Sequence, residues 1–485
     1  MKKGEGTYNA VVIGAGPGGL VAAAGLAGLG ARVALIEKGR MGGDCMNTGC
    51  VPSKALIKSA RVAHEFRTAH RFGLAAQDPR PDVGAVFERM RQVRTALEHH
   101  DSVQRFEGLG IDVFQGVAGK LFSPRQVLAG DRQLHTDHVV LATGGRPLVP
   151  PIEGLDRVRF HTNETFFDET TESPGSLCVV GAGPIGSEIS QVMARLGVET
   201  TTVEALGQVL GNEDEDAASL VASSLQADGV DLLLGHTLKK VEPGPAELGP
   251  RAVRATLEEL STKKTFQRDF GALLLAVGRR PNVENLGLEE VGVKVGRGGI
   301  EVDAFLRTSR KNIHAVGDVA GPYQFTHFAD AQARAVVRNI LIPWWPAKFD
   351  LRVVPWCTFT EPECARVGLS ERDAKDKGVQ HSVYRFELSD LDRAVCDSTT
   401  AGFVKVLADA KGRILGATCV GAGAGDWVHE YVLAMKQGIT LSAISGTTHI
   451  YPTWGEASRH PADAFMRGKL TPTAKRLLTR RWGRR

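Results

Sequence analysis

Cysteine is sparse in this chain, with seven residues among 485. An odd and sparse set of cysteines in a long chain argues against a secreted scaffold that is held together by disulfides. Any functional cysteine pair must therefore be recognised from its local spacing.

The apolar stretch 11–36 lacks the features of a signal peptide or a membrane span. It follows Lys2 and Lys3, but its centre carries four glycines and a proline, and Arg32 precedes its end. It shows no small-residue cleavage pattern. We therefore expect a cytoplasmic protein.

Acidic residues are absent from the C-terminal tail, residues 466–485, which holds eight basic residues. The rest of the chain has 51 basic against 55 acidic residues, so the excess positive charge belongs to the tail and gives no case for nucleic-acid binding. Leu477, Leu478 and Trp482 lie among the basic residues of the tail. The tail can attach peripherally to an anionic membrane surface, or it can be solvated or packed in a dimer.

What the chain does contain is typical of an α/β enzyme with several domains. Its length exceeds what a single hydrophobic core supports, so two to four domains are expected. A hydrophobic content of 42% and 56 glycines fit a turn-rich α/β protein.

An internal near-repeat predicts two dinucleotide-binding units. "YNAVVIGAGPGGLVAAAGLAGLGARVALIEKG" begins at Tyr8, and "LCVVGAGPIGSEISQVMARLGVETTTVEALG" begins at Leu177. Each copy has the pattern of a buried strand, a GxGxxG turn, a helix of small residues and a second strand that ends in glutamate. The glycines allow a tight turn, a close approach of backbone amides to a pyrophosphate and the packing of helix on strand.

The glutamates that end these units are placed to accept hydrogen bonds from a ribose diol. Glu37 lies 23 residues after Gly14, and Glu204 lies 23 residues after Gly181. A carboxylate would repel a 2′-phosphate, so Glu204 predicts that the second site prefers NAD over NADP.

Further glycine-bearing turns follow the same plan. "VVLATGGRP" (139–147) and "LLLAVGRRPN" (273–282) each run an apolar strand into a Gly-Arg-Pro turn. "NIHAVGDVAG" (312–321) ends an apolar strand with Asp318, beside a helix expected to start near Thr326. An aspartate at the end of a strand can bind a polyol chain.

The segment "GGDCMNTGCVPSK" (42–54) contains a cysteine pair. On a regular helix Cys45 and Cys50 would rise about 7.5 Å and point apart, so a disulfide between them requires a distorted backbone. A helix that starts near Val51 would lower the pKa of Cys50, and Lys54 adds positive charge. The spacing does not match a zinc site, and we expect no metal site; a dithiol couple and two inert core cysteines remain as the two interpretations.

Together these motifs resemble the class I pyridine nucleotide–disulfide oxidoreductases, which include dihydrolipoamide dehydrogenase, glutathione reductase and mercuric reductase. The motifs occur in the family's order over nearly the whole chain. The resemblance implies a homodimeric, FAD-dependent NAD(P)H oxidoreductase that acts on a sulfur group. It implies an α/β fold with two Rossmann-like domains, for FAD and NAD, and a C-terminal α+β dimerisation domain.

The resemblance also implies a division of the chain and a set of site residues. The division is an FAD domain (1–155), an NAD(P) domain (156–283), a second part of the FAD domain (284–350) and an interface domain with the basic tail (351–485). FAD would contact Gly14, Gly16, Gly19, Glu37, Gly43, Lys54, Ala118, Thr143, Gly144, Asp318 and Ala329, and NADH would contact Gly181, Gly183, Ile185, Gly186, Glu204 and Gly278.

The resemblance gives the catalytic residues their roles. Cys50 would be the thiol beside the flavin and Cys45 the interchange thiol that faces the substrate. Lys54 and Glu188 would form a buried ion pair beside the flavin, because either charge alone would be uncompensated.

One departure from the family pattern lies in "THIYPTWGE" (448–456). Tyr451 occupies the position of the family's histidine, which reaches across the dimer and serves as acid and base, while Glu456 matches the glutamate that orients it. A tyrosine titrates near pH 10 and a histidine near pH 6.5, so turnover of a large disulfide is in doubt.

The final electron acceptor therefore stays open at this point. A disulfide or thiol of the dihydrolipoamide type is the first expectation. Mercuric reductase resembles this chain in its tyrosine, which keeps a metal ion open, but its C-terminal vicinal cysteine pair is absent here. The third alternative is a quinone reductase or diaphorase at the membrane surface.

Overall fold

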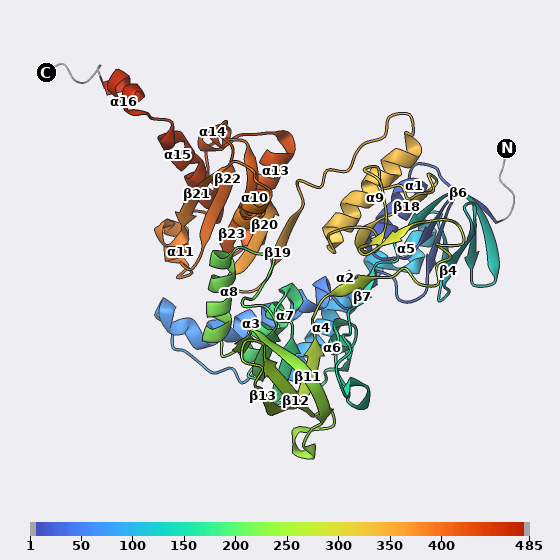
Figure 1. Cartoon of the computed structure of the whole chain (residues 1–485), viewed down its shortest axis with the longest axis horizontal. Helices are drawn as coiled ribbons and strands as arrows, with labels where there is room; N and C mark the ends of the chain where they lie inside the picture. The colour runs from blue at the N-terminus through green and yellow to red at the C-terminus, as the bar shows by residue number, and fades with distance from the viewer. Residues whose placement is uncertain (1–5, 480–485) are drawn as a thin grey trace.

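The computed structural model describes residues 6–479, which form three connected parts (Figure 1). The N-terminal part and the segment before the C-terminal part share one sheet. The middle part contains the second copy of the repeat, and the C-terminal part contains an antiparallel sheet with helices around it. Within residues 6–479, no helix is both long and apolar enough to cross a membrane.

The first sheet has seven strands built around the first copy of the repeat. Its central strands are parallel, because buried strands that alternate with helices are joined by crossovers. In spatial order the strands are β3 (Asp112–Gln115), β2 (Val33–Glu37), β1 (Thr7–Ile13), β6 (Arg132–Leu141), β5 (Gln126–Ala129) and β4 (Gly119–Ser123), with β18 (Ile313–Ala315) parallel to β6.

Two helices cover one face of this sheet. α1 (Pro17–Ala27) starts with a proline in its first turn, and its small residues allow close packing against α9 (Thr326–Leu341). Both α9 and β18 follow the middle part in the sequence, so the first sheet and its helical cover are built from two separate segments of the chain. The sequence-based expectation of a helix near Thr326 is confirmed.

The middle part repeats the parallel arrangement with four strands. Its sheet has the order β10 (Asp231–Leu234), β9 (Glu199–Glu204), β8 (Ser176–Val180) and β14 (Ala272–Leu275), and α7 (Pro184–Arg195) and α8 (Glu215–Ala227) flank it. A three-stranded antiparallel sheet lies beside it: β11 (His236–Pro243), β12 (Val253–Glu259) and β13 (Thr265–Phe270).

A helical insertion connects the first two parts. The short helix α2 (Gly43–Asn47) is followed by the long helix α3 (Cys50–Thr68), which packs on α7 and α4 (Val83–Leu97). Apolar residues of α3, α4 and α7, among them Leu56, Phe87 and Ile189, share one buried core. This packing brings the start of α3 to the middle part of the molecule. The insertion also contains α5 (Val103–Gly108), and α6 (Asn163–Glu169) lies in the chain between β6 of the first sheet and β8 of the middle part.

The C-terminal part is an antiparallel five-stranded sheet with helices, as the sequence predicts. The strand order is β19 (Pro355–Thr358), β20 (Glu363–Gly368), β23 (Ile414–Gly421), β22 (Phe403–Ala408) and β21 (Ser382–Glu387). The helices are α10 (Glu371–Asp376), α11 (Asp392–Cys396), α12 (Ala424–Trp427), α13 (His429–Gln437), α14 (Leu441–Ser445), α15 (Arg459–Gly468) and α16 (Pro472–Thr479).

Candidate active site

Two glycines at the turn between β1 and α1 leave no room for a side chain. Gly14 has φ +103°, and a Cβ atom there would lie 2.3 Å from the carbonyl oxygen of Ala142. A Cβ at Gly19 would lie 1.8 Å from the carbonyl oxygen of Gly14. A Cβ at Gly16 would meet no atom closer than 3.8 Å, so this glycine leaves the space in front of the helix N-terminus open for a pyrophosphate.

The second loop repeats this geometry almost atom for atom. Gly181 has φ +102°, and a Cβ there would lie 2.5 Å from the carbonyl oxygen of Ala276. A Cβ at Gly186 would lie 1.9 Å from the carbonyl oxygen of Gly181, whereas Gly183 faces open space. The two GxGxxG segments are thus two copies of one anion-binding turn.

The two strand-end glutamates are also held in the same way. The Ala15 N–H donates to the carboxylate of Glu37 at 2.7 Å, and the Ala182 N–H donates to the carboxylate of Glu204 at 2.7 Å. Each carboxylate therefore lies beside its glycine turn, at the position that a ribose diol would reach.

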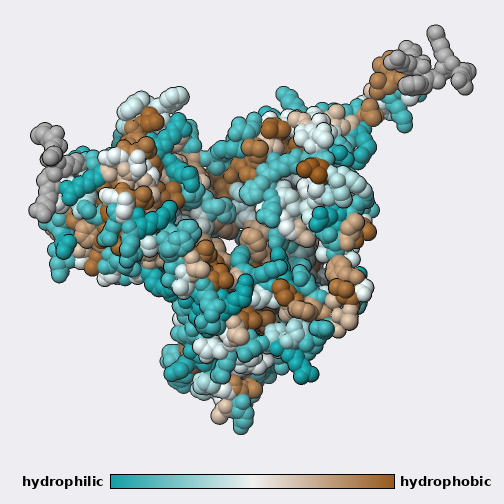
Figure 2. Space-filling view, turned by 180° about the vertical axis from the view of Figure 1, so that it is seen from behind, coloured by the Kyte–Doolittle hydropathy of each residue, from teal (hydrophilic) through white to brown (hydrophobic). Residues whose placement is uncertain are grey.

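Both turns open into one cavity of about 2640 Å³. The space-filling view shows a hollow where the parts of the molecule meet (Figure 2). Of the predicted site residues, Gly19 and Gly186 lie behind the turns and Tyr451 and Glu456 lie elsewhere. Those that line the cavity are Gly14, Gly16, Glu37, Gly43, Cys45, Cys50, Lys54, Ala118, Thr143, Gly144, Gly181, Gly183, Ile185, Glu188, Glu204, Gly278, Asp318 and Ala329.

The cysteine pair lies at a break between two helices. α2 ends at Asn47, Gly49 adopts φ −140° and ψ −107°, and α3 starts at Cys50, one residue before the expected start. Both cysteines are free thiols in this structure. The break brings Cys45 within hydrogen-bonding reach of Cys50, which a continuous helix would not do.

The surroundings of Cys50 favour its thiolate. A hydrogen bond from Cys45 lowers the pKa of Cys50 to about 6, with help from Thr326 and the charge of Lys54 and against the effect of burial. The Oγ1 atom of Thr326 lies 3.5 Å from the sulfur of Cys50. The same interaction with Cys50, together with burial, raises the pKa of Cys45. Both shifts favour the thiolate at Cys50 over the thiolate at Cys45.

Lys54 and Glu188 meet although they lie 134 residues apart. The Lys54 ammonium donates to both carboxylate oxygens of Glu188, at 2.9 and 3.1 Å. The Phe359 N–H also donates to this carboxylate at 2.9 Å, and the Lys54 ammonium lies 4.1 Å from the centre of the Phe359 ring. The side chain of Glu188 is 6% exposed and that of Lys54 is 35% exposed, so the pair stands at the cavity wall with its anion buried.

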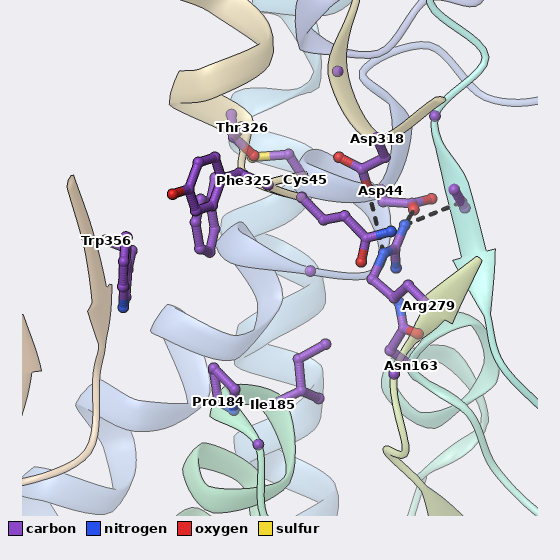
Figure 3. A pocket seen from close by; sticks show the side chains of 18 of the residues that line it. Asp44, Cys45, Asn163, Pro184, Ile185, Arg279, Asp318, Phe325, Thr326 and Trp356 are labelled. Carbon is purple, nitrogen blue, oxygen red and sulfur yellow. Dashed lines mark hydrogen bonds and ion pairs between the residues drawn. The ribbon is translucent and has the colours of Figure 1, made fainter. Parts of the chain in front are cut away.

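A largely buried arginine joins two carboxylates in the wall of the same cavity. Arg279 makes an ion pair with Asp44 and a second one with Asp318, whose Oδ2 lies 3.3 Å from the guanidinium Nε (Figure 3). It also donates to the carbonyl oxygen of Gly145 at 3.0 Å. Burial raises the pKa of Asp318, and the Arg279 charge acts against that effect.

Tyr451 and Glu456 lie on the C-terminal part, outside the cavity. Tyr451 is 65% exposed, and its hydroxyl donates to the carboxylate of Asp392 at 2.6 Å; this bond raises the pKa of Tyr451. Glu456 is buried and lies 3.5 Å from Arg459. The expectation that Glu456 orients residue 451 is therefore corrected: its carboxylate is directed to Arg459, and Asp392 binds the tyrosine hydroxyl. His449 faces Glu430 at 3.0 Å.

Thr326, Arg279 and Asp392 are site residues that the sequence reasoning missed. Arg279 directly follows Gly278 in a motif that was recognised, and Thr326 was recognised only as a helix start. Asp392 gives no signal in the sequence, because only the fold brings α11 to Tyr451.

The cavity fits FAD and a nicotinamide dinucleotide. In each glycine turn the first and third glycines allow close backbone contacts, and the second leaves open the space that a pyrophosphate would fill. The two glutamates lie beside the turns. Asp318 lies just after a strand, as expected of a polyol-binding group. Cys50, Lys54 and Glu188 line the same cavity between the two turns.

Comparison with known proteins agrees with this geometry. Residues 8–333 match the family described as pyridine nucleotide-disulphide oxidoreductase, and residues 354–462 match the dimerisation domain of that family. The dihydrolipoyl dehydrogenase of Corynebacterium glutamicum is 34% identical over 477 residues, covering 94% of this chain and 97% of that protein. The mercuric reductase of Bacillus cereus is 31% identical over 456 residues, covering 94% and 71%.

A solved structure extends the likeness to three dimensions. The copper(II) complex of RclA, an HOCl-induced flavoprotein disulfide reductase from Escherichia coli, superposes with a TM-score of 0.82 at 27% identity and covers 94% of this chain and 99% of that chain.

The chain belongs to the pyridine nucleotide–disulphide oxidoreductase family. It is an FAD-dependent, NAD(P)H-linked flavoprotein disulfide oxidoreductase, and its cofactors are FAD and NAD(H). The matched dimerisation domain supports a homodimer.

Proposed function

We propose that Cys45 and Cys50 are the dithiol couple of this enzyme and that its substrate is a disulfide or dithiol of the dihydrolipoyl type. The observation that carries the proposal is the position of Cys50. It stands at the N-terminus of α3 as a thiol with its pKa lowered to about 6, in the cavity that both glycine turns share. The matches to dihydrolipoyl dehydrogenases support the substrate class.

Bound FAD would supply two-electron exchange between NADH and the dithiol. Its binding residues would be Gly14, Gly16, Gly19, Glu37, Gly43, Lys54, Ala118, Thr143, Gly144, Asp318 and Ala329. Lys54 and Glu188 would hold a fixed charge pair at its reactive edge. The residues Gly181, Gly183, Ile185, Gly186, Glu204 and Gly278 would hold the nicotinamide dinucleotide.

The dithiol step follows from the two different thiols. Cys45 attacks one sulfur of the substrate disulfide while the Cys50 thiolate takes its proton, and the first substrate thiolate leaves with a proton from solvent. Cys50 then gives its proton to the second substrate thiol as its sulfur attacks Cys45. The substrate gains two electrons and two protons, and the enzyme gains the Cys45–Cys50 disulfide.

The second site should prefer NADH to NADPH. The carboxylate of Glu204 accepts hydrogen bonds from the backbone N–H groups of Ala182 and Leu206, at 2.7 and 2.9 Å, so it is fixed where a 2′-phosphate would have to lie. Two negative groups at that place repel each other.

In the homodimer, Tyr451 and Glu456 would complete the substrate site of the partner subunit. Tyr451 is exposed and bound to Asp392, so it can present a hydroxyl but no group that titrates near neutral pH. This favours a second candidate, a metal ion as electron acceptor, since a metal ion needs no proton from the enzyme. The match to a mercuric reductase is consistent with it.

The basic tail would add a peripheral contact with an anionic membrane. Leu470, Leu477 and Leu478 are 52%, 60% and 63% exposed, and α16 stands out from the rest of the molecule (Figures 1 and 2). Exposed leucines beside Lys475 and Arg476 fit an interfacial helix. The other basic residues of the tail, from Arg480 to Arg485, and Trp482 lie outside the described residues.

The proposed division of labour uses the predicted boundaries: residues 1–155 and 284–350 for FAD, 156–283 for NAD and 351–485 for the dimer contact. Segments 1–155 and 156–283 each contain one glycine turn. Segment 284–350 returns to the first sheet through β18, which lies just before Asp318.

An acceptor panel tests the function. NADH or NADPH oxidation would be measured with lipoamide, glutathione disulfide, mercuric ion and a quinone, for wild-type protein and for Tyr451→His. The proposal expects lipoamide reduction that rises in Tyr451→His and is lost in Cys45→Ala. Rapid reduction of mercuric ion with no lipoamide activity in either protein would select the metal-ion candidate. Quinone turnover that Cys45→Ala leaves unchanged, with no lipoamide or glutathione disulfide activity in any of the proteins, would overturn the dithiol proposal.

A further inference from the structure

The short helix that carries Cys45 is held at both ends by buried arginines. At its first turn, the Asp44 carboxylate is paired with Arg279, whose side chain is only 13% exposed. At its last residue, the carbonyl oxygen of Asn47 accepts a hydrogen bond of 3.0 Å from Arg94, whose side chain is 8% exposed. Both arginines come from other parts of the chain, 235 and 47 residues away.

Each arginine is itself fixed by further partners. Arg279 is bound to Asp318 and to the carbonyl oxygen of Gly145. Arg94 is bound to Asp168 at 2.6 Å. A planar guanidinium with several fixed partners cannot follow a moving carboxylate, so each arginine acts as a rigid anchor for α2.

The turn between α2 and α3 has an anchor of its own. The Asn163 side-chain amide donates to the carbonyl oxygen of Thr48 at 3.1 Å, and Asn163 is buried. The Asn47 amide donates to the carbonyl oxygens of Met41 and Gly43, both at 2.9 Å. The segment 43–49 is thus tied on three sides while Cys50 is fixed by the long helix α3.

We propose that Arg279, Arg94 and Asn163 form a clamp that sets the redox equilibrium of the Cys45–Cys50 couple by holding Cys45 against Cys50. These three are positioning residues and act through Asp44, Asn47 and Thr48. The proposal rests on the proposed function, since it assumes that these two cysteines are the redox couple.

The physical reason is the effective concentration of one thiol at the other. Oxidation joins the two sulfurs, removes two protons and two electrons, and passes the electrons to a dithiol–disulfide buffer such as dithiothreitol. A clamped dithiol has already given up the freedom that the disulfide would remove, so the clamp favours the disulfide. A released segment makes the reduced form relatively more stable and the midpoint potential more positive.

The first test variant is Asp44→Ala in the full-length protein with its cofactor. It frees the start of α2, while Arg279 keeps its ion pair with Asp318 and its hydrogen bond to the carbonyl oxygen of Gly145. The positive charge of Arg279 is therefore not left unpaired in the variant. The matched control is Asp269→Ala, which removes one carboxylate from the exposed pair with Arg254 at 2.8 Å, on the three-stranded antiparallel sheet of the middle part. Asn163→Ala frees the turn without any change of charge.

The proteins would be equilibrated in dithiothreitol redox buffers and alkylated, and the peptide with both cysteines would be quantified by mass spectrometry. We expect the equilibrium constant for disulfide formation to fall about tenfold in Asp44→Ala, the effect of one lost charge-assisted hydrogen bond, which raises the midpoint potential by about 30 mV. Asn163→Ala should shift in the same direction, and Asp269→Ala should match the wild type.

The outcomes separate the clamp from the function on which it rests. If the wild-type protein forms no Cys45–Cys50 disulfide in any buffer, the proposed function fails. If the disulfide forms but Asp44→Ala and Asn163→Ala keep the wild-type equilibrium constant, the clamp is refuted and the dithiol function stands. An equal shift in Asp269→Ala would also refute the clamp, because the effect would then be one of charge alone.

Discussion

Removal of Cys45 should raise the pKa of Cys50. The hydrogen bond from Cys45 is the largest influence on the Cys50 thiolate, ahead of Thr326 and Lys54, and it acts against burial. In Cys45→Ala the opposing effect of burial remains while the main donor is gone. We therefore expect the pKa of Cys50 to rise from about 6 to about 8, close to that of a free thiol.

The size of the effect can be read as a change in thiolate population. At pH 7 a thiol with a pKa of about 6 is roughly nine-tenths ionised, and one with a pKa of about 8 is roughly one-tenth ionised. The lowered pKa means that the thiolate is fully present above pH 7 and is lost as the pH falls through 6. In the variant the loss begins near pH 9.

Alkylation by iodoacetamide measures this population in protein freed of FAD, because Cys50 lines the open cavity and only the thiolate reacts. The rate at Cys50 would be followed from pH 4 to 10 in reduced protein by peptide mass spectrometry. Cys178→Ala, which removes a buried cysteine, is the control. A midpoint that stays near pH 6 in Cys45→Ala would refute the account of how the thiolate is stabilised.

Three further predictions follow from contacts in the site. Lys54→Met should lower the free energy of unfolding by about 3 kcal/mol, because it leaves the Glu188 carboxylate buried without its positive partner. The double variant Lys54→Met with Glu188→Leu should recover most of that loss in urea unfolding, and equal stability of the single and double variants would contradict this. Gly186→Ala should weaken NADH binding at least about tenfold in a fluorescence titration while FAD content is retained, since the added Cβ would strike the second glycine turn; unchanged NADH affinity would be the contrary result. Asp392→Asn should lower the pKa of Tyr451, so that the phenolate absorbance of this residue appears at a lower pH; Tyr451→Phe, which lacks that absorbance, identifies it. An unshifted titration would speak against the hydrogen bond between Tyr451 and Asp392.

The features that could be predicted from the sequence are those with a local signature. The glycine turns and the terminal glutamates were found because strand, turn and helix follow one another within about thirty residues, and the structure repeats them in both copies. The helix start at Cys50 was found within one residue. The contact between Lys54 and Glu188 was expected only through the family resemblance, since no local pattern links residues 134 positions apart.

The features that were missed are side-chain contacts between distant segments. The bond between Arg94 and Asn47 and the ion pair between Arg279 and Asp44 depend on how α4 and the short strand β15 (Arg279–Pro281) lie around the cysteine segment. The partner of Tyr451 could not be assigned either. The position of Glu456 along the chain suggested it, but the fold directs that carboxylate to Arg459 and brings another one to the tyrosine.

The most direct test of the central claim is to count thiols before and after reduction by NADH. The oxidised, FAD-loaded protein would be treated with one equivalent of NADH under anaerobic conditions and alkylated at once, and each cysteine would be quantified by mass spectrometry. We predict that Cys45 and Cys50 become alkylated only after NADH is added and that Cys178 does not change. Alkylation of both cysteines before NADH, or of neither after it, would contradict the account.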